Sequence, residues 1–344
     1  MVIQMTTYRN NLPQFDGTIL LTDSGLETTL IFHDGIDLPA FAAYPLMETD
    51  SGRETLARYY RRHLSIAADH GTGFVLEAPT WRASRDWGAE LGHGPEDLAR
   101  LNHAAIGFLS DLRASARGVR PVVISGNIGP RGDGYVADTA MTAAEAEAYH
   151  AEQIGWFAET DVDMVTAVTL STVAEGVGAI RAACKRGLPV VVSYTVETDG
   201  RLPDGTPLGT AFEQTDAETD GAAAYFMVNC AHPDHFRDAL AAGSGWLERI
   251  GGVRANASRL SHAELDAAEE LDAGNPAELG HDYARLRRLL PNLVVLGGCC
   301  GTDHRHVEAI ADCCVARTAP DRPAAVRNLP GGVLLPPFFK EHLQ

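Results

Sequence analysis

Long hydrophobic runs are missing from this sequence of 344 residues. No apolar stretch approaches the roughly 20 residues that a transmembrane helix needs. The first residues, MVIQMTTYRNNLPQF, also lack the apolar segment of a secretory signal peptide. We therefore expect a cytoplasmic protein that does not interact with membranes.

Positive charge is also scarce. The chain has 28 lysine and arginine residues against 46 aspartate and glutamate residues, which gives a formal net charge of −18. Nucleic acids and anionic membrane surfaces are bound through basic patches. The composition therefore argues against a nucleic-acid partner, and the acidic excess is interpreted as a contribution to solubility.

Two sequence signatures are absent as well. No G-x-G-x-x-G motif follows the first apolar run at 18–23, which argues against a dinucleotide-binding fold. No low-complexity tract, linker or change in charge divides the chain. We therefore expect a single domain over residues 1–344.

What is present is an alternation of short apolar runs with longer helical patterns. Continuous apolar runs are typical of parallel strands that are buried on both faces. Eight such units predict an α/β fold, a (β/α)8 TIM barrel, with an open doubly wound sheet as the alternative. The predicted strands lie at 18–23, 73–78, 121–127, 163–168, 189–195, 224–230, 248–257 and 292–298.

Helical patterns occupy the segments between these runs. Residues 52–71 and 95–118 each end in glycine, and 142–160 opens with a T-x-x-E capping box. Two connections, 31–50 and 258–280, are longer than usual. Both follow the carboxyl end of a strand, so in a barrel both would lie over the catalytic face.

Three of the six cysteines fall at predicted strand ends: Cys230, Cys299 and Cys300. The last two form the doublet of the sequence GGCCG at 297–301, where glycines allow the backbone to leave strand geometry and both thiols to turn the same way. We expect reduced thiols, which leaves packing, a metal site or a 299–300 disulfide as alternatives. The other cysteines, 184, 313 and 314, lie in helical patterns and are assigned to packing.

Three thiolates at one place suit Zn²⁺, with a fourth position for a substrate. Three cysteinates give such a site a net charge of −1, which makes the metal a weak Lewis acid. A site of this kind still lowers the pKa of a bound thiol and holds it as a nucleophile at neutral pH. The matching chemistry is alkyl transfer to sulfur.

Four segments of the chain form a recognisable set: LTDSGLETTL (21–30), SGNIGPRGDGY (125–135), VNCAHP (228–233) and LGGCCGTDHRHVEAI (296–310). Together they resemble the homocysteine S-methyltransferases, a family of zinc-dependent barrel enzymes. The resemblance covers about residues 17–315, which would be the barrel core, with 316–344 as a tail. It implies that Cys230, Cys299 and Cys300 are the zinc ligands and take part in catalysis.

The resemblance also implies substrate-binding positions. Asp23 matches the aspartate associated with the amino group of homocysteine, with a turn or cap role as the alternative. Asn229 is expected to orient Cys230, or to satisfy backbone groups at the strand end. Ser125, in the S-x-G-P loop, and Tyr194, at the end of the fifth strand, complete the predicted set.

The sequence departs from the family at the end of the fourth predicted strand. Val168 stands where the family commonly has a carboxylate. Glu77, at the end of the second strand, is our candidate to supply that charge. The competing interpretation is that the acceptor is not homocysteine.

The implied function is transfer of a methyl group from a small onium donor to homocysteine, which gives methionine. S-methylmethionine or S-adenosylmethionine is the favoured donor and betaine is possible, since the predicted mouth is acidic and several aromatic residues could face a cation. The alternatives are the same chemistry on another thiol or selenol, and a hydrolase, lyase or metal-binding zinc barrel. The aromatic candidates are Phe41, Trp81, Trp87 and Tyr194; the nearby His232, His304 and His306 are assigned to surface or capping roles.

Overall fold

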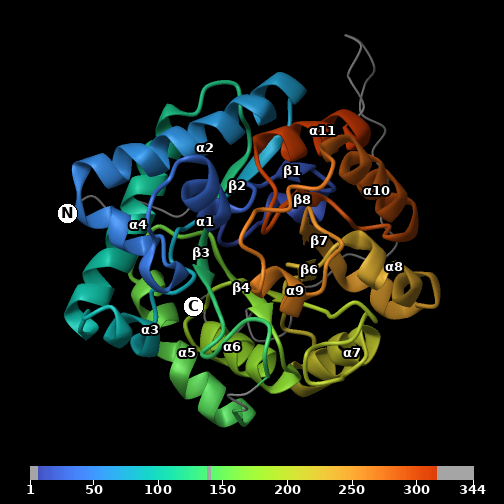
Figure 1. The fold of residues 1–344 in the computed structure, drawn as a ribbon. Helices are drawn as coiled ribbons and strands as arrows, with labels where there is room; N and C mark the ends of the chain where they lie inside the picture. The colour runs from blue at the N-terminus through green and yellow to red at the C-terminus, as the bar shows by residue number, and fades with distance from the viewer. Residues whose placement is uncertain (1–6, 138–140, 316–344) are drawn as a thin grey trace.

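A closed barrel of eight parallel strands forms the centre of the computed structural model, which describes residues 7–137 and 141–315. The strands pair in sequence order and the last pairs with the first (Figure 1). The predicted TIM barrel is confirmed, and the open doubly wound sheet is wrong. The predicted tail, 316–344, lies outside the described residues. The strands are β1 (Leu20–Leu21), β2 (Gly73–Glu77), β3 (Val122–Ile128), β4 (Met164–Leu170), β5 (Val190–Tyr194), β6 (Phe226–Asn229), β7 (Ile250–Ala255) and β8 (Val295–Gly298).

Helices surround the barrel on the outside (Figure 1). Every residue of β2, β4 and β5 is buried, because the strands face the barrel interior on one side and the helices on the other. None of the described helices has the length and apolar character needed to cross a membrane. The helices are α1 (Leu26–Thr28), α2 (Asp50–His70), α3 (Arg85–Glu90), α4 (Pro95–Ser115), α5 (Ala143–Ala158), α6 (Val173–Lys185), α7 (Leu208–Thr219), α8 (Pro233–Ala241), α9 (His262–Asp266), α10 (Pro276–Leu289) and α11 (His304–Cys314).

Local signals set the start of α5 and the end of α2 as the sequence indicates, whereas α4 ends at Ser115, before the predicted glycine at 118. The Thr142 side chain accepts a hydrogen bond from the backbone of Glu145, and the Glu145 carboxylate accepts one in return, so the predicted capping box opens α5. Helix α2 stops at Gly71, whose φ of 64° is in the left-handed region that glycine favours.

The two long connections fold into short helical turns. Residues 31–50 contain most of a π-helical turn, η2 (Thr29–His33), and two 3-10 turns, η3 (Pro39–Phe41) and η4 (Tyr44–Glu48). The second connection, 258–280, contains α9 and the start of α10, which agrees with its predicted partial helicity. Two further 3-10 turns are η1 (Pro13–Asp16) and η5 (Gly245–Arg249).

At the opposite, amino-terminal end of the barrel, the fold is tied together by Asp163, which directly precedes β4. Its buried carboxylate accepts hydrogen bonds from the backbone of Tyr8 at 2.8 Å and of Ile124 at 2.9 Å. It also accepts one from Arg113 of α4 at 2.8 Å. This carboxylate joins the N-terminal segment, β3 and α4.

We expect Asp163→Ala to lower the free energy of unfolding by about 3 kcal/mol, because it leaves a largely buried cation and two backbone N–H groups without an acceptor. Chemical denaturation measures the loss. Asp238→Ala, which removes an exposed aspartate of α8, is the control and should change stability by less than about 0.5 kcal/mol. Equal stability of the two variants would contradict this role.

Candidate metal and substrate site

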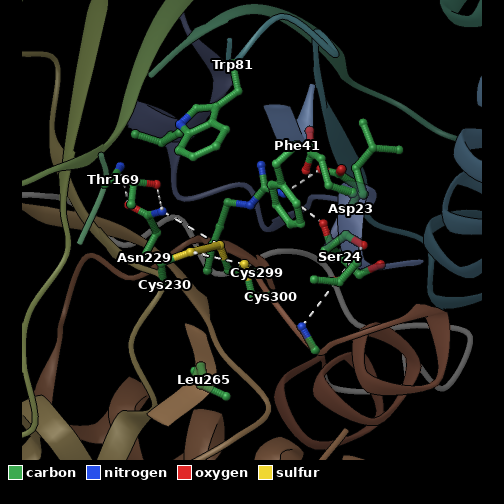
Figure 2. Close-up of a pocket in the computed structure, with 18 of the residues that line it drawn as sticks. Asp23, Ser24, Phe41, Trp81, Thr169, Asn229, Cys230, Leu265, Cys299 and Cys300 are labelled. Atoms are coloured by element: carbon green, nitrogen blue, oxygen red, sulfur yellow. Dashed lines mark hydrogen bonds and ion pairs between the residues drawn. A yellow bond between two sulfur atoms is a disulfide. The ribbon is translucent and has the colours of Figure 1, made fainter. Parts of the chain in front are cut away.

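A cavity of about 400 Å³ opens at the carboxyl ends of the strands (Figure 2). Its walls come from the ends of the strands and from the two long connections, which contribute Phe32 and Phe41 on one side and Leu265 and Leu271 on the other. Of the residues predicted at the site, Asp23, Glu77, Asn229 and the three cysteines line this cavity.

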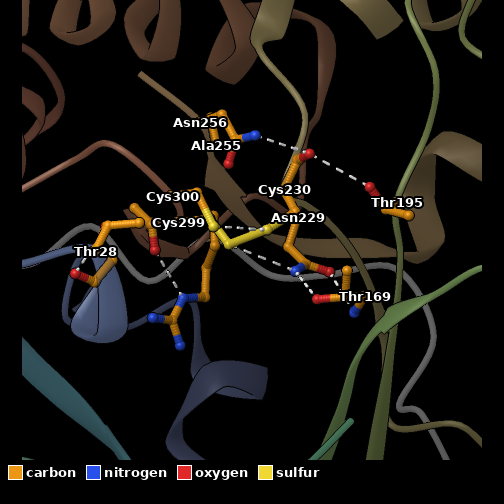
Figure 3. The surroundings of a disulfide bond; sticks show 12 residues. Thr28, Thr169, Thr195, Asn229, Cys230, Ala255, Asn256, Cys299 and Cys300 are labelled. Carbon is orange, nitrogen blue, oxygen red and sulfur yellow. Dashed lines mark hydrogen bonds between the residues drawn. A yellow bond between two sulfur atoms is a disulfide. The ribbon is translucent and has the colours of Figure 1, made fainter. Parts of the chain in front are cut away.

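Three sulfur atoms converge on one side of the cavity, as predicted. Cys230 follows β6, and Cys299 and Cys300 follow β8, and the three sulfur atoms lie within 4.8 Å of one another. Cys230 and Cys299 are joined in a disulfide, while Cys300 is a free thiol whose Sγ is 3.7 Å from that of Cys230 (Figure 3).

This disulfide differs from the expected reduced thiols. It also joins a different pair from the 299–300 alternative. Strands β6 and β8 are separated by β7, but both cysteines lie just beyond their strands and Cys230 turns out of strand geometry. The Cα atoms of Cys230 and Cys299 are therefore only 5.3 Å apart, within the range that a disulfide spans. The other three cysteines lie outside the cavity lining.

The backbone of Cys230 is held in a rarely used conformation. Its φ is 54°, in the left-handed region that costs a non-glycine residue about 1–3 kcal/mol. Three side chains donate hydrogen bonds to its carbonyl oxygen. Asn256 does so at 3.0 Å and Thr195 at 3.3 Å (Figure 3), and His262 does so at 2.8 Å. These contacts, from three different segments, hold the Cys230 backbone in place.

The three glycines beside the cysteine doublet were predicted to take the backbone out of strand geometry, and only one of them does so. Residues 297 and 298 remain in β8, and only Gly301, with a φ of 78°, is left-handed. Gly297 and Gly298 serve close packing instead. A Cβ atom at Gly297 would lie 2.5 Å from Oγ1 of Thr22, and one at Gly298 would lie 2.0 Å from Oγ1 of Thr302.

The Asn229 side chain contacts Cys299, whereas the sequence predicted that it would orient Cys230. Its amide oxygen accepts hydrogen bonds from the backbone of Thr169 at 2.8 Å and from Ser193 at 2.6 Å. Its amide nitrogen donates to Oγ1 of Thr169 at 2.8 Å and contacts Sγ of Cys299 at 3.8 Å. Asn229 is therefore a fixed donor beside Cys299 rather than Cys230.

With the Cys230–Cys299 bond reduced, the sulfur cluster would fit a zinc ion. Two zinc–sulfur bonds of about 2.3 Å at a tetrahedral angle place their sulfur atoms about 3.8 Å apart. The separation of 3.7 Å between the sulfurs of Cys230 and Cys300 matches that value. Tyr135, from the loop after β3, places its hydroxyl 3.5 Å from both sulfurs, and its ring stacks on His262 at 4.0 Å between centroids.

The Asp23 carboxylate, at the end of β1, is already paired. It accepts a hydrogen bond from Arg254 of β7 at 2.8 Å and another from Tyr59 at 3.1 Å. Arg254 also donates to the backbone oxygens of Ser24 and Gly298. This buried ion pair compensates the charge that was predicted to bind the amino group of a substrate.

Glu77, in contrast, has a free carboxylate oxygen. Oε1 accepts a hydrogen bond from Thr166 at 3.1 Å, and Ser125 bonds to Thr166 at 2.7 Å behind it. Oε2 is buried and has no partner among the described residues. Burial raises the pKa of Glu77 to about 7, and Glu27, also in the cavity lining, has its pKa raised to about 7 for the same reason.

Tyr194 does not line the cavity. Its buried hydroxyl bonds to Thr215 of α7 at 2.6 Å, so the side chain packs between the barrel and the outer helices. The geometry therefore indicates a packing role for Tyr194 rather than the predicted contact with substrate. Ser125 is also absent from the lining; its hydroxyl lies behind the cavity wall, bonded to Thr166. Of the aromatic candidates, Phe41 and Trp81 line the cavity.

Two arginines of the cavity were not singled out from the sequence. Arg254 lies in the predicted strand 248–257, where a charged residue amid apolar neighbours was a visible signal. Arg82 lies in the segment TWRAS after β2, between Trp81 and Trp87. Its signal was a cation flanked by aromatic residues at a strand end.

The family model described as homocysteine S-methyltransferase matches residues 20–314. The chain belongs to this family. Its match spans β1 to the end of α11 and includes the whole site described above. A comparison with curated protein sequences finds no match.

Solved structures share the family's fold. The homocysteine methyltransferase MmuM from Escherichia coli, in its oxidized form, is 17% identical, with a TM-score of 0.67 over 86% of this chain and 95% of that one. Its metallated form is also 17% identical, with a TM-score of 0.65 over 88% and 98% of the two chains. At this identity the likeness shows the fold alone.

The raised pKa of Glu77 predicts a pH-dependent effect on stability. Because its folded-state pKa, about 7, is above the ordinary 4.5, the unfolded chain releases this proton first as the pH rises. The wild type should therefore lose stability relative to Glu77→Gln between about pH 4.5 and 7, by up to about 3 kcal/mol. Denaturation of both proteins at pH 5 and pH 8 measures the change. A difference that stays constant with pH would contradict a buried, titrating Glu77.

Proposed function

We propose that this chain is a zinc-dependent S-methyltransferase that transfers a methyl group from a small onium donor to homocysteine and gives methionine. The observation that carries the proposal is the convergence of the Cys230, Cys299 and Cys300 sulfurs in a cavity at the barrel mouth. Membership in the homocysteine S-methyltransferase family supports it. The reduced cysteines would hold the metal, which excludes the Cys230–Cys299 disulfide.

When bound, zinc would supply a site where an acceptor thiol loses its proton and is held as a thiolate. The protein's part is to fix the geometry. The hydrogen bonds to the carbonyl of Cys230 and the donor amide of Asn229 hold the sulfurs in place. The acceptor sulfur then forms a bond to the methyl carbon while the carbon–onium bond breaks, and the leaving group departs neutral with that electron pair.

The cavity suits a cationic donor. Glu27 and Glu77 line it, while Phe41 and Trp81 offer aromatic faces. S-methylmethionine and S-adenosylmethionine are the favoured donors, and betaine fits the same description. No histidine is among the described residues that line the cavity, so the geometry favours sulfur chemistry over a hydrolytic zinc site.

A second acceptor class is favoured by two features of the site. Asp23 is paired with Arg254, and Val168 offers no carboxylate, so an amino group has fewer anionic partners than the family resemblance implies. Another thiol or a selenol, without an amino group at that place, would fit this arrangement. Glu77 is the carboxylate used to decide between the two, because its Oε2 is buried without a partner among the described residues.

Metal analysis tests the cofactor. Freshly reduced protein, purified with added zinc, should retain about one zinc per chain. Cys300→Ser should lose most of this metal, whereas Cys313→Ser, at an exposed thiol of α11, should keep it. Zinc content near zero in the reduced wild type would remove the proposed mechanism.

A methyl-transfer assay tests the acceptor. With homocysteine, Glu77→Gln should raise KM by about tenfold or more, since a charged hydrogen bond to the amino group is lost. With 4-mercaptobutyrate, which lacks the amino group, the same variant should leave KM unchanged. Because the Glu77 pKa is about 7, the wild-type KM for homocysteine should fall as the pH rises through 7. An unchanged KM for homocysteine in the variant would favour the other acceptor class.

A further inference from the structure

Arg82 is held rigidly at the wall of the cavity. It lies in the turn after β2, lines the cavity and is only 9% exposed. Its guanidinium carbon is 3.4 Å from the centroid of the Trp87 ring and 4.5 Å from that of Trp81. Stacking on two aromatic rings fixes the plane of the guanidinium and leaves its edge for hydrogen bonding.

That edge has no acceptor within the described part of the chain. Nε and Nη1 of Arg82 are buried and make no hydrogen bond, and the guanidinium enters no ion pair there. Arg254, in the same cavity, has Asp23 and two backbone oxygens as acceptors. A buried cation without an acceptor is unfavourable unless a ligand supplies one. Arg82 is therefore a site for an anionic group of a ligand.

The strand order places Arg82 across the mouth from Cys230, whereas Cys299 and Cys300 follow β8, which is separated from β2 by β1. In the closed ring of eight strands, β2 and β6 are separated by three strands on either side. Arg82 follows β2, and Cys230 follows β6. In a direct displacement the donor approaches the acceptor sulfur from the side opposite the groups that hold it. The remote end of the donor then points toward the β2 side of the cavity.

We propose that Arg82 binds the carboxylate of the methyl donor, so that the donor class is a carboxylated onium compound. This inference rests on the proposed methyltransferase function. A planar guanidinium accepts a carboxylate through two parallel hydrogen bonds, which fixes both the position and the orientation of the donor. An onium compound without a carboxylate would leave Arg82 unpaired and bind less tightly.

Calorimetric titration of the reduced, zinc-loaded protein without any thiol measures donor binding separately from transfer. The probes are two matched pairs: glycine betaine with choline, and S-methylmethionine with its carboxamide. The wild type should bind the carboxylated member of each pair more tightly. Arg82→Gln should weaken binding of that member roughly 10- to 100-fold and leave its carboxylate-free partner unchanged.

Two further variants complete the test. Arg85→Gln, which removes an exposed cation three residues away, should bind all four probes as the wild type does. Arg82→Lys keeps the positive charge but loses the planar guanidinium that can donate two parallel hydrogen bonds. It should weaken the binding of the carboxylated probes only, and by less than Arg82→Gln does. If Arg82→Gln fails to fold, this lysine variant carries the comparison.

The inference is overturned if the wild type shows no preference for the carboxylated probes, or if both members of a pair weaken equally. It is also overturned if Arg82→Gln leaves donor binding intact and instead weakens homocysteine relative to its decarboxylated analogue, 3-aminopropanethiol. The methyl-transfer assay fails or succeeds independently of these titrations. If the protein transfers no methyl group but still prefers the carboxylated probes, the proposed function is wrong while the anion site at Arg82 stands.

Discussion

The left-handed backbone of Cys230 is the constraint on which the rest of the site depends. A residue at the end of a regular strand would continue the alternation of side chains between the two faces of the sheet. The turn at Cys230 instead places its sulfur beside those of the β8 doublet. Its carbonyl is held by side chains that follow β5 and β7 and by His262 of α9. The barrel and the connection 258–280, which contains α9, therefore fix this conformation together.

The charges of the cavity form a second level of organisation. Arg254 and Asp23 neutralise each other within the wall, and this pair also ties β1 to β7 and to the backbone at Gly298. Glu27 and Glu77 have raised pKa values because the same burial disfavours their charged forms. Among the described residues, Arg82 is the cation of the wall that makes no hydrogen bond or ion pair. Oε2 of Glu77 also lacks a partner there, as do Nε1 of Trp81 and Oδ1 of Asn127. Glu77 and Arg82 both belong to the β2 side of the mouth.

The sequence was sufficient for the barrel and the sulfur cluster, but not for the side chains around them. Buried parallel strands appear as continuous apolar runs, and strand ends are where barrel sites form, so the three cysteines could be placed together. Tyr194 was misplaced because neighbouring residues of a strand point to opposite faces: Ser193 faces Asn229, and Tyr194 faces α7. The pair of Asp23 and Arg254 joins residues 231 positions apart, and only closure of the barrel brings them into contact.

The two departures from the family pattern, Val168 and Glu77, both change where negative charge lies in the cavity. Val168 removes a carboxylate at β4, and Arg254 occupies the one at β1, so two anionic positions that would face an amino group are lost. Glu77 adds one at β2, beside the turn that carries Arg82. An ammonium group bound at Glu77 would sit nearer to β2 than the family resemblance implies, and would share that side of the cavity with the donor carboxylate. On the proposed function, the opposite charges of Glu77 and Arg82 would complement two opposite charges of the substrates. This would account for the lack of a partner for either group among the described residues of the wall.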